Sequence, residues 1–295
     1  MTEFSLPSFA KINWTLRVLG KREDSFHELF TVFQTVSLND TLSFSDADAL
    51  ELTCDDPNIP VNETNLIVRA AEALRRAFGV ANGAAIHLEK RIPSPGGLGG
   101  GSSNAAVALI GLNRLWELDL PLYELHSIGE ELGSDVPFFL YGGTAMGTGR
   151  GELIEPIDDI AAENMVIVTP PIAVSTAEAF YGLDASALTI EERNRILPVC
   201  RAEALTLDPR RTALINDFEG MVFNAHPEIA WAKTALFELG AVNAAMSGSG
   251  ASVFAIFDNI ETRQTAIKAL DQQSTWRKFA VATVSRSEYR ESLGI

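Results

Sequence analysis

The stretch from residue 8 to residue 20 alternates between apolar and polar side chains. A period of two residues is that of a β-strand with one buried face. We therefore predict a half-buried strand here. Its apolar face carries Ala10, Ile12, Trp14, Leu16 and Val18, and its polar face carries Lys11, Asn13, Thr15 and Arg17.

The rest of the first half mixes strand and helix patterns. Runs rich in β-branched and apolar residues, bounded by polar turns, predict strands over 29–36, 41–45, 50–54 and 84–90. Apolar residues at helical spacing predict helices over 65–78, 102–118 and 122–132, the last ending at Gly133.

A second half begins near Ile157. Its patterns predict a strand over 165–169, helices over 176–181 and 227–239, a strand–turn–strand through 246–257, a helix over 260–270 and a strand over 279–284. Strands mixed with helices, without strict alternation, are typical of an α+β fold. The length of 295 residues suits two domains or one large one.

Composition narrows the class of protein. The chain is 46% hydrophobic, enough for a sizeable core, and carries 39 acidic against 23 basic residues, a formal charge of −16. This balance argues against a nucleic-acid partner, because a phosphate backbone is bound by Lys and Arg. To bind a phosphorylated small molecule, so acidic a protein would need a local anion-binding feature such as the N–H groups at a helix start.

Neither a leader nor a membrane span is expected. The first 14 residues show no basic start and no apolar run. Residues 92–113 are uncharged and long enough to span a bilayer, but they open with prolines and glycines whose backbone could not be satisfied in lipid. We expect Cys54 and Cys200 to be reduced and packed as small apolar residues, and the protein to be cytoplasmic.

The strongest local signal is a glycine-rich loop that runs into a helix. Five of the six residues from Gly96 to Gly101 are glycine, which lets the backbone approach a ligand closely. We expect Ser102 or Ser103 to cap the helix, whose N–H groups would face an anion, phosphate above all. The spacing fits neither the Walker pattern nor G-x-G-x-x-G. The alternative interpretation is a flexible surface loop.

The loop resembles the central motif of the GHMP kinases, which include galactokinase, homoserine kinase and mevalonate kinase. Five further motifs follow the family order, at residues 9–13, 26–35, 65–71, 133–139 and 246–251. The set is most similar to the branch that phosphorylates the 2-hydroxyl of 4-diphosphocytidyl-2-C-methyl-D-erythritol in non-mevalonate isoprenoid precursor synthesis. The resemblance implies two α+β domains: residues 1–155, like domain 2 of ribosomal protein S5, and residues 156–295, ferredoxin-like.

The resemblance also implies catalytic residues. Asp135 matches the family's catalytic aspartate and would accept the proton of the alcohol, while Lys11 would orient it and offset negative charge. ATP is the implied phosphate donor and Mg²⁺ the implied metal, with Ser103 as a metal contact. From the residues alone, Asp135 could equally cap a helix or turn, and Lys11 could be a solvated charge at a strand edge.

The family motifs assign two sets of binding residues. We expect ATP to be bound by Asn65, Lys90, Pro93, Ser94, Pro95, Gly96, Gly97, Leu98, Gly99, Gly100, Gly101, Ser102 and Ser103. We expect the cytidine diphosphate substrate to be bound by Asn13, Phe26, His27, Thr176, Phe180, Ser247, Gly248 and Ser249.

Two positions depart from the family pattern. Phe26 stands where relatives usually have tyrosine, so stacking is kept and a hydroxyl lost, and Pro95 stands where they have glycine, which removes one N–H donor. Without the family, His27 and the two phenylalanines would be taken for core residues, and Ser247 to Ser252 for a simple hairpin turn. No pattern predicts the oligomeric state.

Two other functions remain open at this point. One is a GHMP kinase for another alcohol, such as mevalonate or homoserine, which the Phe-His-Glu-Leu sequence at residues 26–29 disfavours. The other is a GHMP-fold protein that binds ligands without catalysis. Such a protein would be expected to lack Lys11 or Asp135, and both are present.

Overall fold

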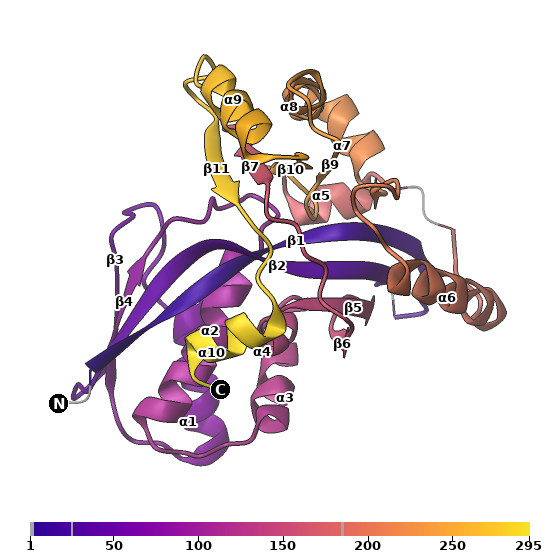
Figure 1. Ribbon diagram of the computed structural model, residues 1–295. Coiled ribbons are helices and arrows are strands. Elements are labelled where there is room, and N and C mark those ends of the chain that lie inside the picture. Colours follow the sequence, from indigo (N-terminus) through magenta and orange to yellow (C-terminus); the bar gives the residue numbers. More distant parts are fainter. Residues whose placement is uncertain (1–2, 25, 184–185) are drawn as a thin grey trace.

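The computed structural model describes residues 3–24, 26–183 and 186–295 (Figure 1). Within these ranges two β-sheets carry the fold. The larger sheet has the strand order β3-β4-β2-β1-β8, and β5 and β6 extend it beside β2. Its strands are β1 (Glu3–Lys21), β2 (His27–Ser45), β3 (Leu50–Cys54), β4 (Ala84–Glu89), β5 (Thr144–Gly149), β6 (Leu153–Pro156) and β8 (Ile215–Asn216).

The smaller sheet is antiparallel throughout, with the order β11-β7-β10-β9. Its strands are β7 (Met165–Thr169), β9 (Asn243–Met246), β10 (Val253–Ile256) and β11 (Arg277–Val281). Numbered along the chain, the spatial order is 4-1-3-2, which is the ferredoxin-like arrangement. The predicted α+β fold with a ferredoxin-like second half is therefore confirmed.

Most helices cover one face of a sheet (Figure 1), whereas the helix over 190–205 packs beside the smaller sheet against the other face of the larger sheet. Against the larger sheet pack α1 (Leu66–Phe78), α2 (Gly100–Leu115), α3 (Leu122–Leu132), α4 (Phe138–Tyr141) and α10 (Arg286–Leu293). The second half contributes α5 (Thr176–Tyr181), α6 (Ile190–Leu205), α7 (Glu219–Ala225), α8 (Pro227–Glu238) and α9 (Ile260–Leu270).

Many predicted elements lie where the pattern placed them. The ranges 50–54, 122–132, 165–169, 176–181 and 260–270 have the predicted bounds. The predicted strands 29–36 and 41–45 are one strand, β2, because the polar residues between them stay paired with β1 across a β-bulge near Phe9. The patterns missed α4, α6, α7, α10, β5, β6 and β8, which are short, polar or interrupted, as α6 is by Pro198.

The prediction of a half-buried β1 is wrong between residues 10 and 14. Lys11 and Asn13 on its polar face are only 3% and 1% exposed, because the glycine loop and the second half of the chain cover them. Lys11 is therefore no solvated edge charge. The opposite face packs against the smaller sheet, where Trp14 meets Phe254 edge to face at 5.4 Å between ring centroids.

The end of the chain returns to the first half. On α10, Tyr289 and Leu293 are buried in the core that covers the larger sheet, and β8 pairs with β1. The division near residue 155 thus stays a prediction. Among the described residues no helix is long and apolar enough to cross a membrane. The uncharged stretch from residue 92 to 113 forms the loop and most of α2.

Candidate active site

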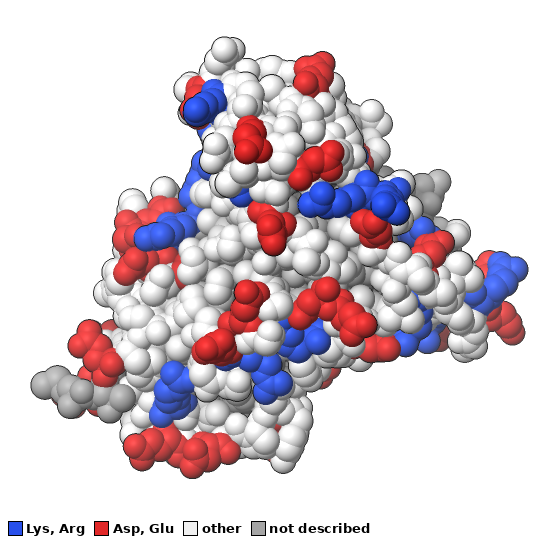
Figure 2. All heavy atoms as spheres, viewed as in Figure 1, with Lys and Arg blue, Asp and Glu red and all other residues white. Residues whose placement is uncertain are grey.

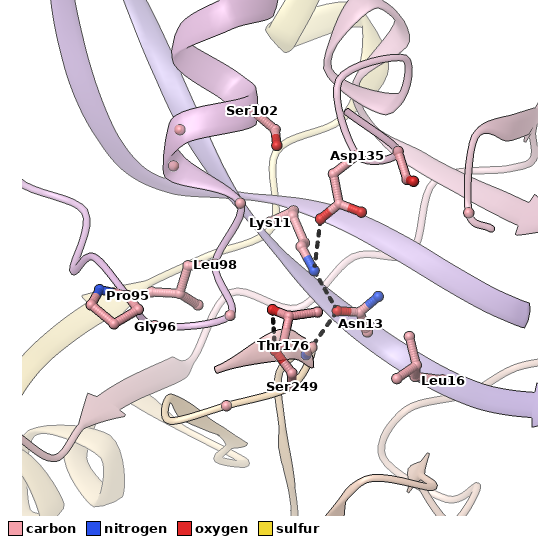
Figure 3. Close-up of a pocket in the computed structure, with 18 of the residues that line it drawn as sticks. Lys11, Asn13, Leu16, Pro95, Gly96, Leu98, Ser102, Asp135, Thr176 and Ser249 are labelled. Atoms are coloured by element: carbon pink, nitrogen blue, oxygen red, sulfur yellow. Dashed lines mark hydrogen bonds and ion pairs between the residues drawn. The ribbon is translucent and has the colours of Figure 1, made fainter. Parts of the chain in front are cut away.

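A cavity of about 370 Å³ opens between the two halves of the chain (Figure 3). Strand β1 supplies Lys11 and Asn13, and the turn between α3 and α4 supplies Asp135. The glycine loop contributes residues 93–102, and a second glycine turn between β9 and β10 contributes residues 248–250. Segments far apart in the sequence therefore meet at one site.

An ion pair lies in this cavity. Lys11 Nζ is 3.4 Å from Asp135 Oδ2, and the lysine side chain is 4% exposed against 32% for the aspartate. Lys11 Nζ also donates to Asn13 Oδ1 at 2.7 Å (Figure 3). It lies 5.4 Å from the centre of the Phe33 ring. The ammonium is thus fixed from several sides, while the carboxylate keeps one oxygen free of this contact and open to the cavity.

Asn13 joins the ion pair to the second half. Its Oδ1 accepts a further hydrogen bond from the backbone N–H of Gly248 at 3.0 Å, and its Nδ2 donates to Thr31 Oγ1 at 2.7 Å. Residues two apart on a strand share a face, so Lys11 and Asn13 project together. Strand β1 therefore positions the Lys11–Asp135 pair through Lys11 and the second glycine turn through Asn13.

The helix after the glycine loop has no side-chain cap. Helix α2 begins at Gly100, with Gly99 as N-cap in the left-handed region at φ 69°, so the predicted capping by Ser102 or Ser103 is wrong. The uncapped N–H groups at this helix start are suited to bind an anion. Ser102 lines the cavity, whereas Ser103 is buried and its Oγ lies 2.8 Å from that of Ser8.

The two glycine turns contact each other directly. Ser247 Oγ donates to Gly97 O at 2.9 Å, and Ser252 N donates to Gly96 O at 3.2 Å. A Cβ on Gly97 would lie 2.1 Å from Ser247 O. This glycine is therefore required for the contact between the turns. The sequence suggested only that it lets a ligand approach the backbone closely.

Four predicted binding residues line neither this cavity nor the adjoining one described below. Asn65 caps α1 by accepting from Ile67 N and donates to Pro60 O, although its neighbour Leu66 does line the cavity. The Lys90 side chain is 5% exposed and pairs with Asp40 at 2.9 Å. Ser247 is buried under the turn contact described above, and Ser103 is buried against Ser8. These four side chains face away from both cavities, and their binding of ATP or substrate stays a prediction.

A second cavity of about 620 Å³ adjoins the first and shares Leu29, Ser134, Arg150 and Phe180 with it. The rings of His27 and Phe180 stack at 5.1 Å, and the Arg150 guanidinium lies 4.9 Å from the centre of the Phe26 ring. Burial, and next the charge of Lys21, lower the pKa of His27. The imidazole is therefore held in its neutral form near pH 7.

Comparisons with known proteins agree over most of the chain. The family model described as GHMP kinases N terminal domain matches residues 65–143, and GHMP kinases C terminal matches residues 202–274. A 4-diphosphocytidyl-2-C-methyl-D-erythritol kinase of Solibacter usitatus is 44% identical over 97% of this chain and 90% of its own length. One of Syntrophotalea carbinolica is 40% identical over 97% of this chain and 100% of its own.

The chain belongs to the GHMP kinase family, in the group of 4-diphosphocytidyl-2-C-methyl-D-erythritol kinases. A solved 4-(cytidine 5'-diphospho)-2C-methyl-D-erythritol kinase is 31% identical, with a TM-score of 0.76 over 95% of this chain and 99% of the other. A homoserine kinase from Cytophaga hutchinsonii has a TM-score of 0.73 over 98% of this chain and 96% of its own at 19% identity, which shows the shared fold alone.

Sequence reasoning missed several residues of this GHMP kinase. Thr31 holds the Asn13 amide, and Asn216 on β8 donates to Met246 O and Gly248 O, both at 2.8 Å. Arg150 lines both cavities. Threonine in a long strand and asparagine in a two-residue strand carry no local signal, so only the tertiary contacts reveal these roles. Thr176, predicted to bind substrate, meets Ser249 at 3.0 Å between hydroxyls.

Proposed function

We propose that this kinase transfers the γ-phosphoryl group of ATP to the 2-hydroxyl of 4-diphosphocytidyl-2-C-methyl-D-erythritol. The observation that carries the proposal is the Lys11–Asp135 ion pair, which lies in one cavity between an uncapped helix start and an adjoining aromatic cavity. The helix start beside the ion pair suits a phosphate next to a general base. The aromatic cavity suits a flat ring such as cytosine. The names of its relatives supply the substrate.

Asp135 is the proposed general base. Its exposed carboxylate oxygen would accept the hydroxyl proton as the alcohol oxygen forms a bond to the γ-phosphorus and the bond to the β–γ bridging oxygen breaks. Lys11, held by Asn13, would keep the carboxylate oriented and offset negative charge as the transfer proceeds. The products are the phosphorylated alcohol, ADP and the proton on Asp135.

The phosphates of ATP fit the start of α2. Its uncapped N–H groups face the part of the cavity that Gly100, Gly101 and Ser102 line. Neither the glycine loop nor the glycine turn between β9 and β10 contributes an acidic side chain to the cavity. An anion is stabilised at a helix start even in a chain of charge −16. We propose residues 93–102 as the segment that binds the phosphates.

Mg²⁺ is proposed with few protein ligands. Over the described ranges, no three His, Cys, Asp or Glu side chains group closely enough to hold a metal ion. The Ser102 hydroxyl faces the cavity and offers an oxygen ligand of the kind Mg²⁺ prefers, whereas Ser103 does not. A bound Mg²⁺ would neutralise charge on the β- and γ-phosphates, and EDTA should stop turnover until Mg²⁺ is added back.

The second cavity is the proposed cytidine site. Phe26 is 51% exposed at its rim and Phe180 lies between the two cavities, so both offer ring faces to cytosine. His27 in its neutral form has one donor and one acceptor nitrogen for the edge of the base. These side chains favour a cytidyl substrate over mevalonate or homoserine, which carry no aromatic ring.

A catalytically idle protein of this fold is disfavoured by the site itself. Lys11 and Asp135 are both present and in contact.

We further propose a cytoplasmic location, supported by the free Cys54 and Cys200, and no nucleic-acid partner. On the face shown in Figure 2, basic side chains lie scattered among acidic ones and form no continuous band.

The test is a comparison of alcohols. Purified protein is incubated with ATP, Mg²⁺ and either the cytidyl compound, mevalonate, homoserine or galactose, and ADP release is measured. We expect turnover with the cytidyl compound alone. Turnover with one of the other alcohols and none with the cytidyl compound would overturn the assignment.

A further inference from the structure

Asp40 is a buried carboxylate that the proposed phosphoryl transfer does not use. It lies on β2 with 0% exposure, and each of its oxygens accepts two hydrogen bonds. Oδ1 accepts from the backbone N–H groups of Arg91 and Ile92 at 2.7 and 2.8 Å. Oδ2 accepts from Lys90 Nζ at 2.9 Å and Asn104 Nδ2 at 3.1 Å. A buried charge persists only when paired and bonded in this way.

These four donors flank the glycine loop on both sides. Residues 90–92 lead into the loop from the end of β4, and Asn104 follows it as the fifth residue of α2. The loop between them supplies the wall of the first cavity. A single side chain therefore holds both the entry and the exit of this loop.

Ser8 on β1 completes the attachment. Its hydroxyl oxygen lies 2.6 Å from Asn104 Oδ1 and 2.8 Å from Ser103 Oγ. The bond from Ser8 orients the Asn104 amide so that its nitrogen faces Asp40. The loop is thus fastened to both long strands of the larger sheet, and Lys90 and Ser103 belong to this fastening.

We propose that Asp40 is a positioning residue for nucleotide binding. It holds the two ends of the glycine loop at the separation at which the N–H groups at the start of α2 face the cavity. This role rests on the proposed function, since it takes the loop to bind the phosphates of ATP. Asp40 itself touches neither the cavity nor the Lys11–Asp135 pair.

Two variants separate the parts of this contact. Asp40→Asn keeps the shape and can still accept from the backbone of residues 91 and 92, but its new Nδ2 faces two donors, Lys90 Nζ and Asn104 Nδ2. Asn104→Ala leaves the Asp40–Lys90 ion pair in place and removes the bonds that attach α2 to Asp40 and to Ser8.

ATP binding is measured by isothermal titration calorimetry in the absence of any alcohol. We expect both variants to raise the Kd of ATP about tenfold, since each loses at least one buried hydrogen bond under the loop. The KM for ATP should rise in parallel, while kcat and the KM for the cytidyl substrate stay within about twofold. A general loss of structure would instead move all of these together.

Glu28 provides the matched control. Its carboxylate is also buried, at 2% exposed, and pairs with Arg22 at 3.2 Å and Arg193 at 2.8 Å, but it follows His27 beside the second cavity. Glu28→Gln removes an equally buried charge without touching the glycine loop. We expect its Kd for ATP to equal that of the wild type.

Three results would overturn the role of Asp40. They are an unchanged ATP Kd in either folded variant, an equal loss of ATP binding in Glu28→Gln, and unfolding of both Asp40→Asn and Asn104→Ala by circular dichroism, which would assign the contact to folding alone. Wild-type protein that binds ATP but leaves the cytidyl compound unphosphorylated would overturn the proposed substrate instead, and the calorimetry would still decide the role of Asp40.

Discussion

The Lys11 ammonium group is almost fully buried and contacts an amide, a carboxylate and an aromatic ring. Asn13 Oδ1 accepts from it at 2.7 Å, Asp135 pairs with it at 3.4 Å, and the Phe33 ring lies 5.4 Å away. A buried ammonium group with these partners loses its freedom to move. It is therefore suited to hold a carboxylate beside a reacting phosphate.

Asp135→Asn tests the base directly. The amide has the same shape but cannot accept the proton of the alcohol, so we expect kcat to fall by roughly 10²- to 10⁴-fold. ATP binding should be nearly unchanged, because the start of α2 is untouched. ADP release and calorimetry measure the two quantities, with the exposed Asp158→Asn as control. A rate like that of the wild type would remove Asp135 from the mechanism.

At the scale of elements, two glycine turns from the two halves of the chain form one wall. The loop before α2 and the turn between β9 and β10 share the bonds from Ser247 Oγ to Gly97 O and from Ser252 N to Gly96 O. Asn13 and Asn216 fix the second turn through hydrogen bonds to the backbone N–H and C=O of Gly248. The turns thus position each other, and the cavity depends on their contact.

Gly97→Ala should break this contact. Its φ is 71°, and an added Cβ would lie 2.1 Å from Ser247 O, so both strain and displacement follow. We expect a loss of about 1–3 kcal/mol in the free energy of unfolding, measured in urea, and a raised KM for both substrates.

Gly101→Ala is the matched control for stability. It lies inside α2, and the nearest atom to an added Cβ is 3.7 Å away. Because alanine favours a helix over glycine, its free energy of unfolding should stay equal or rise by up to about 1 kcal/mol. Equal losses in both variants would contradict a specific contact at Gly97.

At the scale of the molecule, the two halves are interleaved. Strand β8 pairs with β1, and α10 returns from the second half to the core of the first. On α10, Tyr289 is fully buried, donates its hydroxyl to Phe139 O at 2.5 Å, and has its pKa raised by burial. Phe139 lies in the segment that follows Asp135, so the last helix supports the turn that carries the proposed base.

Tyr289→Ala should therefore destabilise the whole molecule. Emptying the site of a large buried ring costs about 3–5 kcal/mol, and we expect one cooperative unfolding transition at a lower temperature by calorimetry. Tyr289→Phe, which removes only the hydroxyl, should cost about 1–3 kcal/mol. Two separate transitions in the wild type, with only one shifted in Tyr289→Ala, would contradict this coupling.

The sequence by itself determined the α+β class, most of the elements and the six ordered motifs, whereas the expected roles of Lys11 and Asp135 came from the family resemblance that those motifs carry. These features rest on residues close together in the chain: period-two alternation, helical spacing, and a run of glycines before a helix. The motif order then points to one family, which the relatives confirm.

Only the tertiary structure decided which neighbouring side chains face the cavity. Each residue turns a helix by about 100°, so the observed start at Gly100 directs Ser102 to the cavity and Ser103 to Ser8. Lys90, predicted to bind ATP, pairs with Asp40 from a distant strand, a contact that no local pattern encodes. Phase along a helix and partners far apart in the chain are set by packing, and packing is decided by the whole fold.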